Sequence, residues 1–134
     1  MNSFGWAAPT PELILGVFQL NTGPLSNQSI QVSIDIVNYY KWLVSEKNEF
    51  VLSKQILRSG TGIGANIHEA DYAVSKADFI SKMQIALKET SETEYWLIVL
   101  EQTDFLPEEF SFLKESCISL KKMLVATLNT SKNN

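Results

Sequence analysis

The sequence predicts an all-α protein, an antiparallel up-down four-helix bundle with a non-helical N-terminal arm, on the strength of three observations. First, apolar residues recur every three or four positions in four segments between residues 27 and 130. Second, no segment in that range alternates strictly between apolar and polar residues, as a half-buried strand would. Third, the chain has 134 residues and is 45% hydrophobic, which suits one core in one domain. Short connections between the segments favour antiparallel neighbours.

Residues 1–26 form the predicted arm. They contain three of the four prolines, three of the six glycines and a single charged residue, Glu12. The apolar run at residues 13–18 lacks the basic residues that precede it in a signal sequence. We therefore expect this arm either to pack as a tail on its own domain or to reach a neighbouring subunit. The bundle is expected to span residues 27–130, followed by a disordered tail at residues 131–134.

The first two helical segments follow the arm, and Ser26, Asn27 or Ser29 can serve as the N-cap of the first. The residues at helical spacing in the first segment are Ile30, Ser33, Ile34, Val37, Tyr40, Lys41 and Val44. In the second segment they are Leu52, Ile56, Ser59, Ile63, Ile67 and Ala70. We expect each stripe to face the core, because helices bury their apolar side.

The third segment begins at Ser75, and Asp78 three residues later predicts a capping box with Asp in place of Glu. Its stripe is Phe79, Met83, Ala86, Leu87, Thr90, Leu97 and Leu100. Pro107 suits the first turn of a fourth helix. The last stripe, close to a heptad in spacing, is Phe110, Leu113, Cys117, Leu120, Leu124 and Leu128.

The composition excludes several classes of protein. The net charge of −4 and pI near 5.0 argue against a generally basic nucleic-acid binder. The single cysteine, Cys117, excludes an intramolecular disulfide framework and a zinc site built on cysteines. No apolar run approaches the roughly 18 residues that a membrane span needs. We expect a cytoplasmic protein that does not enter membranes.

Two motifs resemble sites but lack the context that such sites need. Residues 60–65 fit the dinucleotide fingerprint G-x-G-x-x-A, yet the residues before them have a helical pattern where the fingerprint requires a strand. The glycines are better explained by close approach of two helices. The single histidine, His68, has Ala65 where a di-iron bundle would place its glutamate. No nucleophile-elbow motif accompanies His68 either. We therefore predict no catalytic residue, no metal site and no cofactor.

Charge is distributed unevenly along the chain. Lys47, Lys54 and Arg58 have the spacing i, i+7 and i+11, so they would share a face if one helix ran through all three. Residues 89–109 hold seven acidic residues and no lysine or arginine. These runs have three interpretations: ordinary solvated helix surfaces, a basic end that binds RNA phosphates, or an acidic end that binds a basic protein.

Four stretches of the sequence resemble one known family. They are LSKQILRSGTGIGANIHEA at residues 52–70, SKADFI at 75–80, IALKE at 85–89, and ETEYWL at 92–97. These stretches are similar to the four-helix-bundle proteins of intervening sequences in bacterial 23S ribosomal RNA genes. That family includes the accessory variability protein of diversity-generating retroelements. The resemblance extends from about residue 29 to residue 130 and leaves residues 1–26 outside.

The resemblance implies a homopentamer of antiparallel bundles. The retroelement members bind a reverse transcriptase and nucleic acid through a basic surface, with no known catalysis, whereas the function of most members is not established. This chain departs from the family pattern at Gly62, where a small polar residue such as serine is usual. It also carries a net charge of −4 in each copy, which opposes the binding of RNA. Lys47, Lys54 and Arg58 are the candidate nucleic-acid-binding residues.

The polar residues of the motifs require a physical role. We expect five of them to form a hydrogen-bonded network between the second and third helices, because buried polar groups must be paired. They are Asn66, Glu69, Lys88, Glu89 and Glu92. On this hypothesis Glu69→Ala lowers the free energy of unfolding by more than ~1 kcal/mol.

The sequence thus predicts a non-enzymatic, oligomeric interaction or scaffold protein for which RNA is one expected partner. The alternative is an adaptor that binds a protein, such as the reverse transcriptase of a mobile element, without touching nucleic acid.

Overall fold

The computed structural model describes residues 23–133, and this part of the chain forms four α-helices and no strand. The helices are α2 (Pro24–Lys47), α3 (Leu52–Ala70), α4 (Lys76–Gln102) and α5 (Phe112–Asn133), with a short 3₁₀ helix η1 (Glu108–Phe110) before α5. The all-α prediction is confirmed. Helix α2 begins three residues before the expected boundary, and α5 continues to Asn133, into the segment expected to be a tail. Residues 1–22 and 134 lie outside the described residues.

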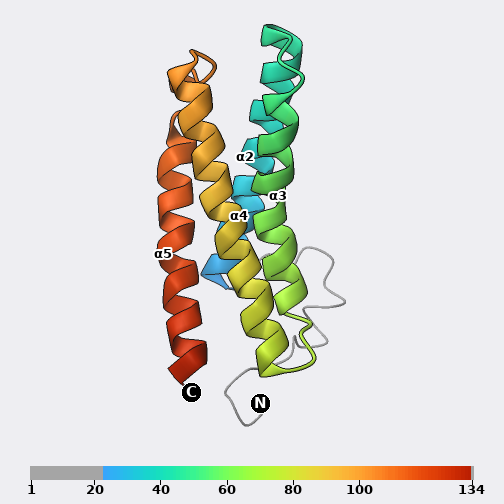
Figure 1. Cartoon of the computed structure of the whole chain (residues 1–134), viewed down its shortest axis with the longest axis vertical. Coiled ribbons are helices and arrows are strands. Elements are labelled where there is room, and N and C mark those ends of the chain that lie inside the picture. Colours follow the sequence, from blue (N-terminus) through green and yellow to red (C-terminus); the bar gives the residue numbers. More distant parts are fainter. Residues whose placement is uncertain (1–22, 134) are drawn as a thin grey trace.

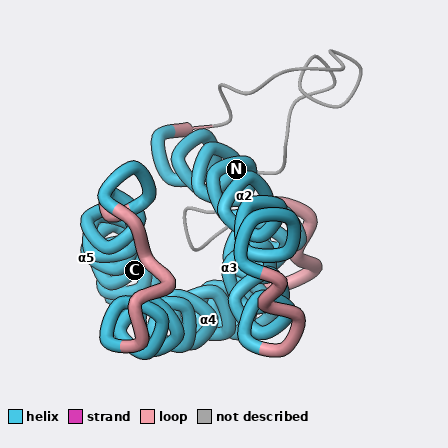
Figure 2. The backbone as a smooth tube through the Cα atoms, turned by 90° about the horizontal axis from the view of Figure 1, so that it is seen from above, coloured by secondary structure: helices cyan, strands magenta, loops and turns pink. Residues whose placement is uncertain are grey.

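The helices run alternately up and down, as Figure 1 shows. Helix α3 packs against α2 and α4, and α5 packs against α4 and α2. Seen from above, α2 and α4 therefore occupy diagonal corners of a four-helix arrangement (Figure 2). In this topology the solvent-facing surface of α2 and the solvent-facing surface of the α4–α5 pair lie on different sides of the bundle.

Side-chain caps fix the starts of two helices. The Ser75 hydroxyl accepts a hydrogen bond from the Asp78 amide at 3.1 Å, and the Asp78 carboxylate accepts one from the Val74 amide at 3.2 Å, so the expected capping pair is present. Glu49 caps α3 by accepting hydrogen bonds from the amides of Val51 and Ser53. The cap at Glu49 was not anticipated from the sequence, because glutamate is not among the usual N-cap residues.

The start of the fourth helix differs from the prediction. Pro107 precedes η1, and α5 begins only at Phe112. The loop before η1 is held to α2, since the Tyr39 hydroxyl donates a hydrogen bond of 2.7 Å to the carbonyl of Phe105. Burial, and to a lesser extent the charge of Glu49, raises the pKa of Tyr39 well above its usual range, so Tyr39 remains a neutral donor.

The core confirms most of the expected stripes. In α3 the buried residues include Ile56, Ser59, Ile63, Ile67 and Ala70. In α5 they are Leu113, Cys117, Leu120, Leu124 and Leu128. In α4 the expected Met83, Ala86, Thr90, Leu97 and Leu100 are buried, together with Thr93. These helices bury the faces that their periodicity indicated.

The stripe assigned to the first helix is wrong. The residues that α2 buries are Ser29, Val32, Ile36, Tyr39 and Leu43. The expected residues Ile30, Val37 and Val44 are half-buried, and Ile34 is 49% exposed. Because α2 has apolar residues on two faces, both at helical spacing, periodicity alone does not determine which face turns inward.

Two glycines allow α3 to approach α2 closely, as the sequence predicted. A Cβ at Gly60 would lie 2.8 Å from the side chain of Ile36. A Cβ at Gly64 would lie 3.1 Å from the Ser33 hydroxyl and 3.3 Å from a backbone carbonyl of α2. At Gly62 the nearest atoms belong to the Glu89 side chain at 3.4 Å, which is ordinary contact. Gly60 and Gly64 thus set the α2–α3 distance, whereas Gly62 does not.

Candidate functional site

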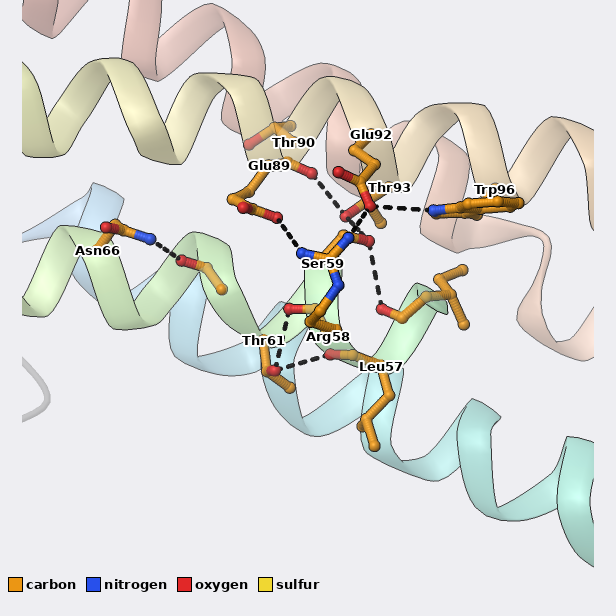
Figure 3. Close-up of polar contacts among 12 residues, drawn as sticks. Leu57, Arg58, Ser59, Thr61, Asn66, Glu89, Thr90, Glu92, Thr93 and Trp96 are labelled. Carbon is orange, nitrogen blue, oxygen red and sulfur yellow. Dashed lines mark hydrogen bonds and ion pairs between the residues drawn. The ribbon is translucent and has the colours of Figure 1, made fainter. Parts of the chain in front are cut away.

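An ionic cluster joins α3 to α4 near the middle of the bundle. The guanidinium of Arg58 on α3 donates a hydrogen bond to the Glu92 carboxylate on α4 and lies 3.8 Å from Glu89 Oε2. The indole N–H of Trp96 donates a 3.2 Å hydrogen bond to the same oxygen of Glu92. Figure 3 shows Arg58 reaching across to both carboxylates. The single arginine of the chain therefore pairs with two acidic groups of α4.

Two buried hydroxyl groups lie close to this cluster. Thr93 Oγ1 on α4 and Ser59 Oγ on α3 are 3.0 Å apart, and both residues are buried (Figure 3). Each also has a backbone carbonyl of its own helix as a partner, from Glu89 for Thr93 and from Ile56 for Ser59. A buried pair of this kind favours one register between α3 and α4, because a shift of either helix would break the hydrogen bond between the two hydroxyls.

The expected polar network is only partly assembled. Glu89 and Glu92 meet at Arg58, but Asn66 donates its hydrogen bond to the carbonyl of Gly62 on its own helix at 2.8 Å. Glu69 pairs with Lys82 at 3.5 Å, and its side chain is 57% exposed. Lys88 is exposed on α4. Arg58 joins Glu89 and Glu92, although the sequence alone indicates it as a residue that binds RNA. No local sequence pattern links Arg58 to these carboxylates, which are 31 and 34 residues away.

The three candidate basic residues do not share one helical face. Helix α2 ends at Lys47, where Asn48 takes the left-handed conformation, and α3 begins at Leu52. Lys47 lies 5.5 Å from the centroid of the Trp42 ring, and Lys54 is exposed in the first turn of α3. Arg58 is held by its two glutamates. Two lysines at the α2–α3 turn, beside the exposed Phe50, thus remain as the candidate basic site.

An apolar outer face runs along α2, and we call it the α2 outer face. It consists of Ile30, Ile34, Val37 and Val44. These residues are spaced by four, three and seven positions, so they form one stripe on the helix. Nothing in the described part of the chain buries Ile34, the most exposed residue of the four. Ile34 is exposed and the other three residues are half-buried, so this face can still accept the side chains of a partner.

A second apolar surface lies over the groove between α4 and α5, and we call it the α4–α5 seam. It consists of Ile98 on α4 with Ile118 and Val125 on α5, all exposed. A shallow pocket lies there between Ile98 and Ile118, with Glu94 and Lys114 beside them. Two ion pairs cross the groove, Lys114 with Glu101 and Lys121 with Glu94. The seam is therefore apolar, with charges that cancel at its edges.

The chain's single cysteine and single histidine have ordinary surroundings. Burial is the main cause that raises the pKa of Cys117 to about 12, so its thiol stays protonated. The ring of His68 lies 5.5 Å from that of Tyr72. Within residues 23–133 no group of three or more histidine, cysteine or acidic residues is placed to hold a metal ion. None of the four helices is long and apolar enough to span a membrane.

The comparisons with known proteins identify the family. The family model of the 23S rRNA-intervening sequence proteins matches residues 25–126. The chain belongs to the 23S rRNA-intervening sequence protein family. The match covers all of α3 and α4 and most of α2 and α5.

A solved structure supports this membership. It is the crystal structure of a protein with unknown function from the S23 ribosomal protein family of Bacteroides thetaiotaomicron VPI-5482. The two chains are 48% identical with a TM-score of 0.75, and the match covers 78% of this chain and 97% of the other. The comparison with curated proteins found no match. The family resemblance noted in the sequence is thus confirmed, and the function of this intervening-sequence protein is a matter for proposal.

Proposed function

We propose that this intervening-sequence protein is a non-enzymatic scaffold whose copies assemble into a homopentamer through the α2 outer face and the α4–α5 seam. The observation that carries the proposal is the presence of two different apolar surfaces on one chain. A two-fold dimer needs a single self-complementary surface, whereas a ring of five needs two different surfaces that fit each other. The pentamer that the family resemblance implies is therefore compatible with this arrangement.

The chemistry of the two surfaces suits this contact. The α2 outer face presents branched aliphatic side chains, and the α4–α5 seam presents isoleucine and valine between two ion pairs. Burying exposed aliphatic area contributes roughly 25 cal/mol per Å². Because α2 and α4 lie at diagonal corners, a copy can use both surfaces at once, with a different neighbour on each side.

Light scattering coupled to size exclusion tests this proposal. We expect a mass near five times 15.1 kDa for the unmodified protein. Ile118→Asp, in the α4–α5 seam, should convert it to a smaller species with unchanged helical content. Val74→Asp is the matched control, because Val74 is 91% exposed at the α3–α4 turn and lies on neither surface. A monomeric mass for the unmodified protein, or a pentamer that tolerates Ile118→Asp, would contradict the proposal.

A second candidate function is contact with RNA at the α2–α3 turn. Lys47 and Lys54 lie close to this turn with the exposed aromatic ring of Phe50 between them in sequence. Cations and an exposed ring suit phosphates and an unstacked base. In a cyclic ring the five turns would lie at one end, so the lysines of all the copies would act together against the acidic net charge.

Fluorescence anisotropy of a labelled RNA over a salt series tests this function. If the lysines contact phosphates, the logarithm of the affinity falls linearly with the logarithm of salt, by about 0.7 per contact. Lys47→Glu with Lys54→Glu should then abolish binding. Lys88→Glu with Lys132→Glu changes the charge equally on exposed residues elsewhere and should preserve more of the affinity. No binding at low salt would contradict RNA contact and leave the protein-binding adaptor as the alternative.

A further inference from the structure

A single charged residue interrupts the apolar stripe of the α2 outer face. Lys41 lies four residues after Val37 and three before Val44, so it occupies the stripe position between them. It is exposed, and no acidic side chain of residues 23–133 forms an ion pair with it. When a neighbouring copy covers the α2 outer face, the ammonium group of Lys41 loses water and requires a carboxylate on that copy.

Contacts through α3 relate levels along α2 to levels along α4. The two helices run in the same direction along the bundle (Figure 1). On one side of α3, a Cβ at Gly60 would lie 2.8 Å from the side chain of Ile36. On the other side, the hydroxyl of the adjacent Ser59 lies 3.0 Å from the hydroxyl of Thr93. Ile36 of α2 and Thr93 of α4 therefore lie at about the same level.

This relation places Lys41 level with the α4–α5 seam pocket. Lys41 follows Ile36 by five residues, and Ile98 follows Thr93 by five residues. Both steps advance about 7.5 Å along a helix, so Lys41 and Ile98 are level with each other. Because helical side chains lean toward the N-terminus of their helix, the Lys41 ammonium group extends toward the level of Glu94, one turn before Ile98.

Glu94 supplies the carboxylate that the seam has at this level. Its side chain is 23% exposed and lines the shallow pocket together with Ile98 and Ile118. Its Oε1 is buried and contacts Lys121, which leaves Oε2 for a second cation. The lysine that also lines the pocket, Lys114, pairs with a different glutamate. The pocket therefore has an apolar wall for a lysine stem and a carboxylate for its ammonium group.

We propose that Lys41 of one copy enters the seam pocket of the next copy, pairs with Glu94 and fixes the register between the two copies. The inference rests on the proposed self-assembly, in which every copy of a ring lies at one level and bundles that stand along its axis pair residues of equal level. A lysine in an otherwise apolar helix interface selects one register, because other alignments bury its charge against apolar side chains. The two residues do not meet within one chain, since α2 and α4 occupy diagonal corners (Figure 2).

Charge reversal in two backgrounds tests this pair. Lys41→Glu should raise the concentration at which the assembly dissociates by at least about tenfold, because two carboxylates then meet in the seam. In a chain that carries Glu94→Gln, the same reversal should raise that concentration by less than about threefold. Lys54→Glu is the matched control, because Lys54 is exposed in the first turn of α3 and lies on neither surface. It should also have an effect of less than about threefold.

Sedimentation velocity over a dilution series measures these concentrations, and circular dichroism checks that each variant keeps its helical content. An equal loss in both backgrounds would place Lys41 at the interface but not against Glu94. No loss would remove Lys41 from the interface. Either result overturns the pair, whereas a monomeric unmodified protein would overturn the proposed assembly and the pair with it.

Cysteine pairs test the register independently. Chains with Lys41→Cys are mixed with chains carrying Ile98→Cys, dissociated, reassembled and oxidised; the native Cys117 is buried. The register predicts a disulfide-linked dimer from this mixture. Ile30→Cys with Ile98→Cys is the control, because Ile30 lies on the same stripe but about 16 Å farther down the helix. A control yield as high as that of the first mixture, or no dimer from either mixture, would overturn the fixed register.

Discussion

Helices α2 and α3 pack against each other but distribute their side chains differently. Helix α3 places its apolar residues on one side and is in contact with a helix on either flank. Helix α2 has a buried stripe and, in addition, an outer face that includes the half-exposed Ile34. If the proposed assembly forms, α3 contributes to the stability of the single chain, whereas α2 contributes both to that stability and to the contact between copies. Substitutions on the two helices should therefore separate the free energy of unfolding from the free energy of association.

The largest effect is expected where α3 touches α2. Gly60→Val should lower the free energy of unfolding by about 3 kcal/mol, because its Cβ would lie 2.8 Å from the buried side chain of Ile36. Gly62→Ala is the matched control on the same helix, where the neighbour is a flexible glutamate side chain at 3.4 Å. Gly62→Ala should raise the free energy of unfolding by up to about 1 kcal/mol, because alanine has a higher helix propensity than glycine. Urea denaturation measures both, and equal losses would show that the close approach does not limit the packing.

A smaller effect is expected on the other flank of α3. Arg58→Ala should cost about 1 to 2 kcal/mol, because it leaves Glu89, whose side chain is 16% exposed, and Glu92 without their cation. Glu69→Ala, which breaks an exposed pair with Lys82, should cost less than about 0.5 kcal/mol. This reverses the larger cost that the sequence alone suggested for Glu69. If the two variants have the same melting temperature in thermal denaturation, the contacts of Arg58 with Glu89 and Glu92 do not stabilise the fold.

On α2 the effect should move from unfolding to association. Ile34→Asp should change the free energy of unfolding of the dissociated chain by less than about 0.5 kcal/mol, since Ile34 is 49% exposed. The same variant should shift the assembly to smaller species in sedimentation velocity at equal concentration. Ile36→Asp, in the buried stripe of the same helix, should unfold the chain. It serves as the control in which the substitution affects folding and not only association. An Ile34→Asp variant that keeps the full assembly would remove α2 from the interface.

The smallest effect concerns the residue that follows α3. Burial raises the pKa of Asp71, against a weaker opposing effect of His68, so folding favours its protonated form. The stability from this group is present below its ordinary pKa and is lost as the pH rises through the raised value. Asp71→Asn should therefore increase the melting temperature slightly at pH 7 and leave it unchanged near pH 3. An equal increase in melting temperature at pH 7 and pH 3 would show that the effect of Asp71→Asn does not come from the ionisation of Asp71.

Several features of the bundle follow from local sequence. The capping pair Ser75 and Asp78 and the apolar stripes of α3, α4 and α5 need only neighbours within a few residues. The glycines at 60 and 64 indicated a close helix approach before its partner was known. Of the candidate site, the sequence predicted Glu89 and Glu92 as members of one cluster.

Other features depend on how the helices pack. Periodicity offers two equivalent apolar stripes on α2, and the side that reaches Gly60 and Gly64 of α3 determines that Ile36 is buried and Ile34 is not. The partner of Arg58 likewise depends on how α3 and α4 align, which fixes contacts between residues 34 positions apart. The helices, the cap of α4 and the family could be predicted from the sequence alone, because these depend on local spacing and on shared residues, whereas the N-cap of α2 is Gly23 and not the expected Ser26, Asn27 or Ser29. Which faces turn inward, and which remain for a partner, depends on the packing of the whole bundle.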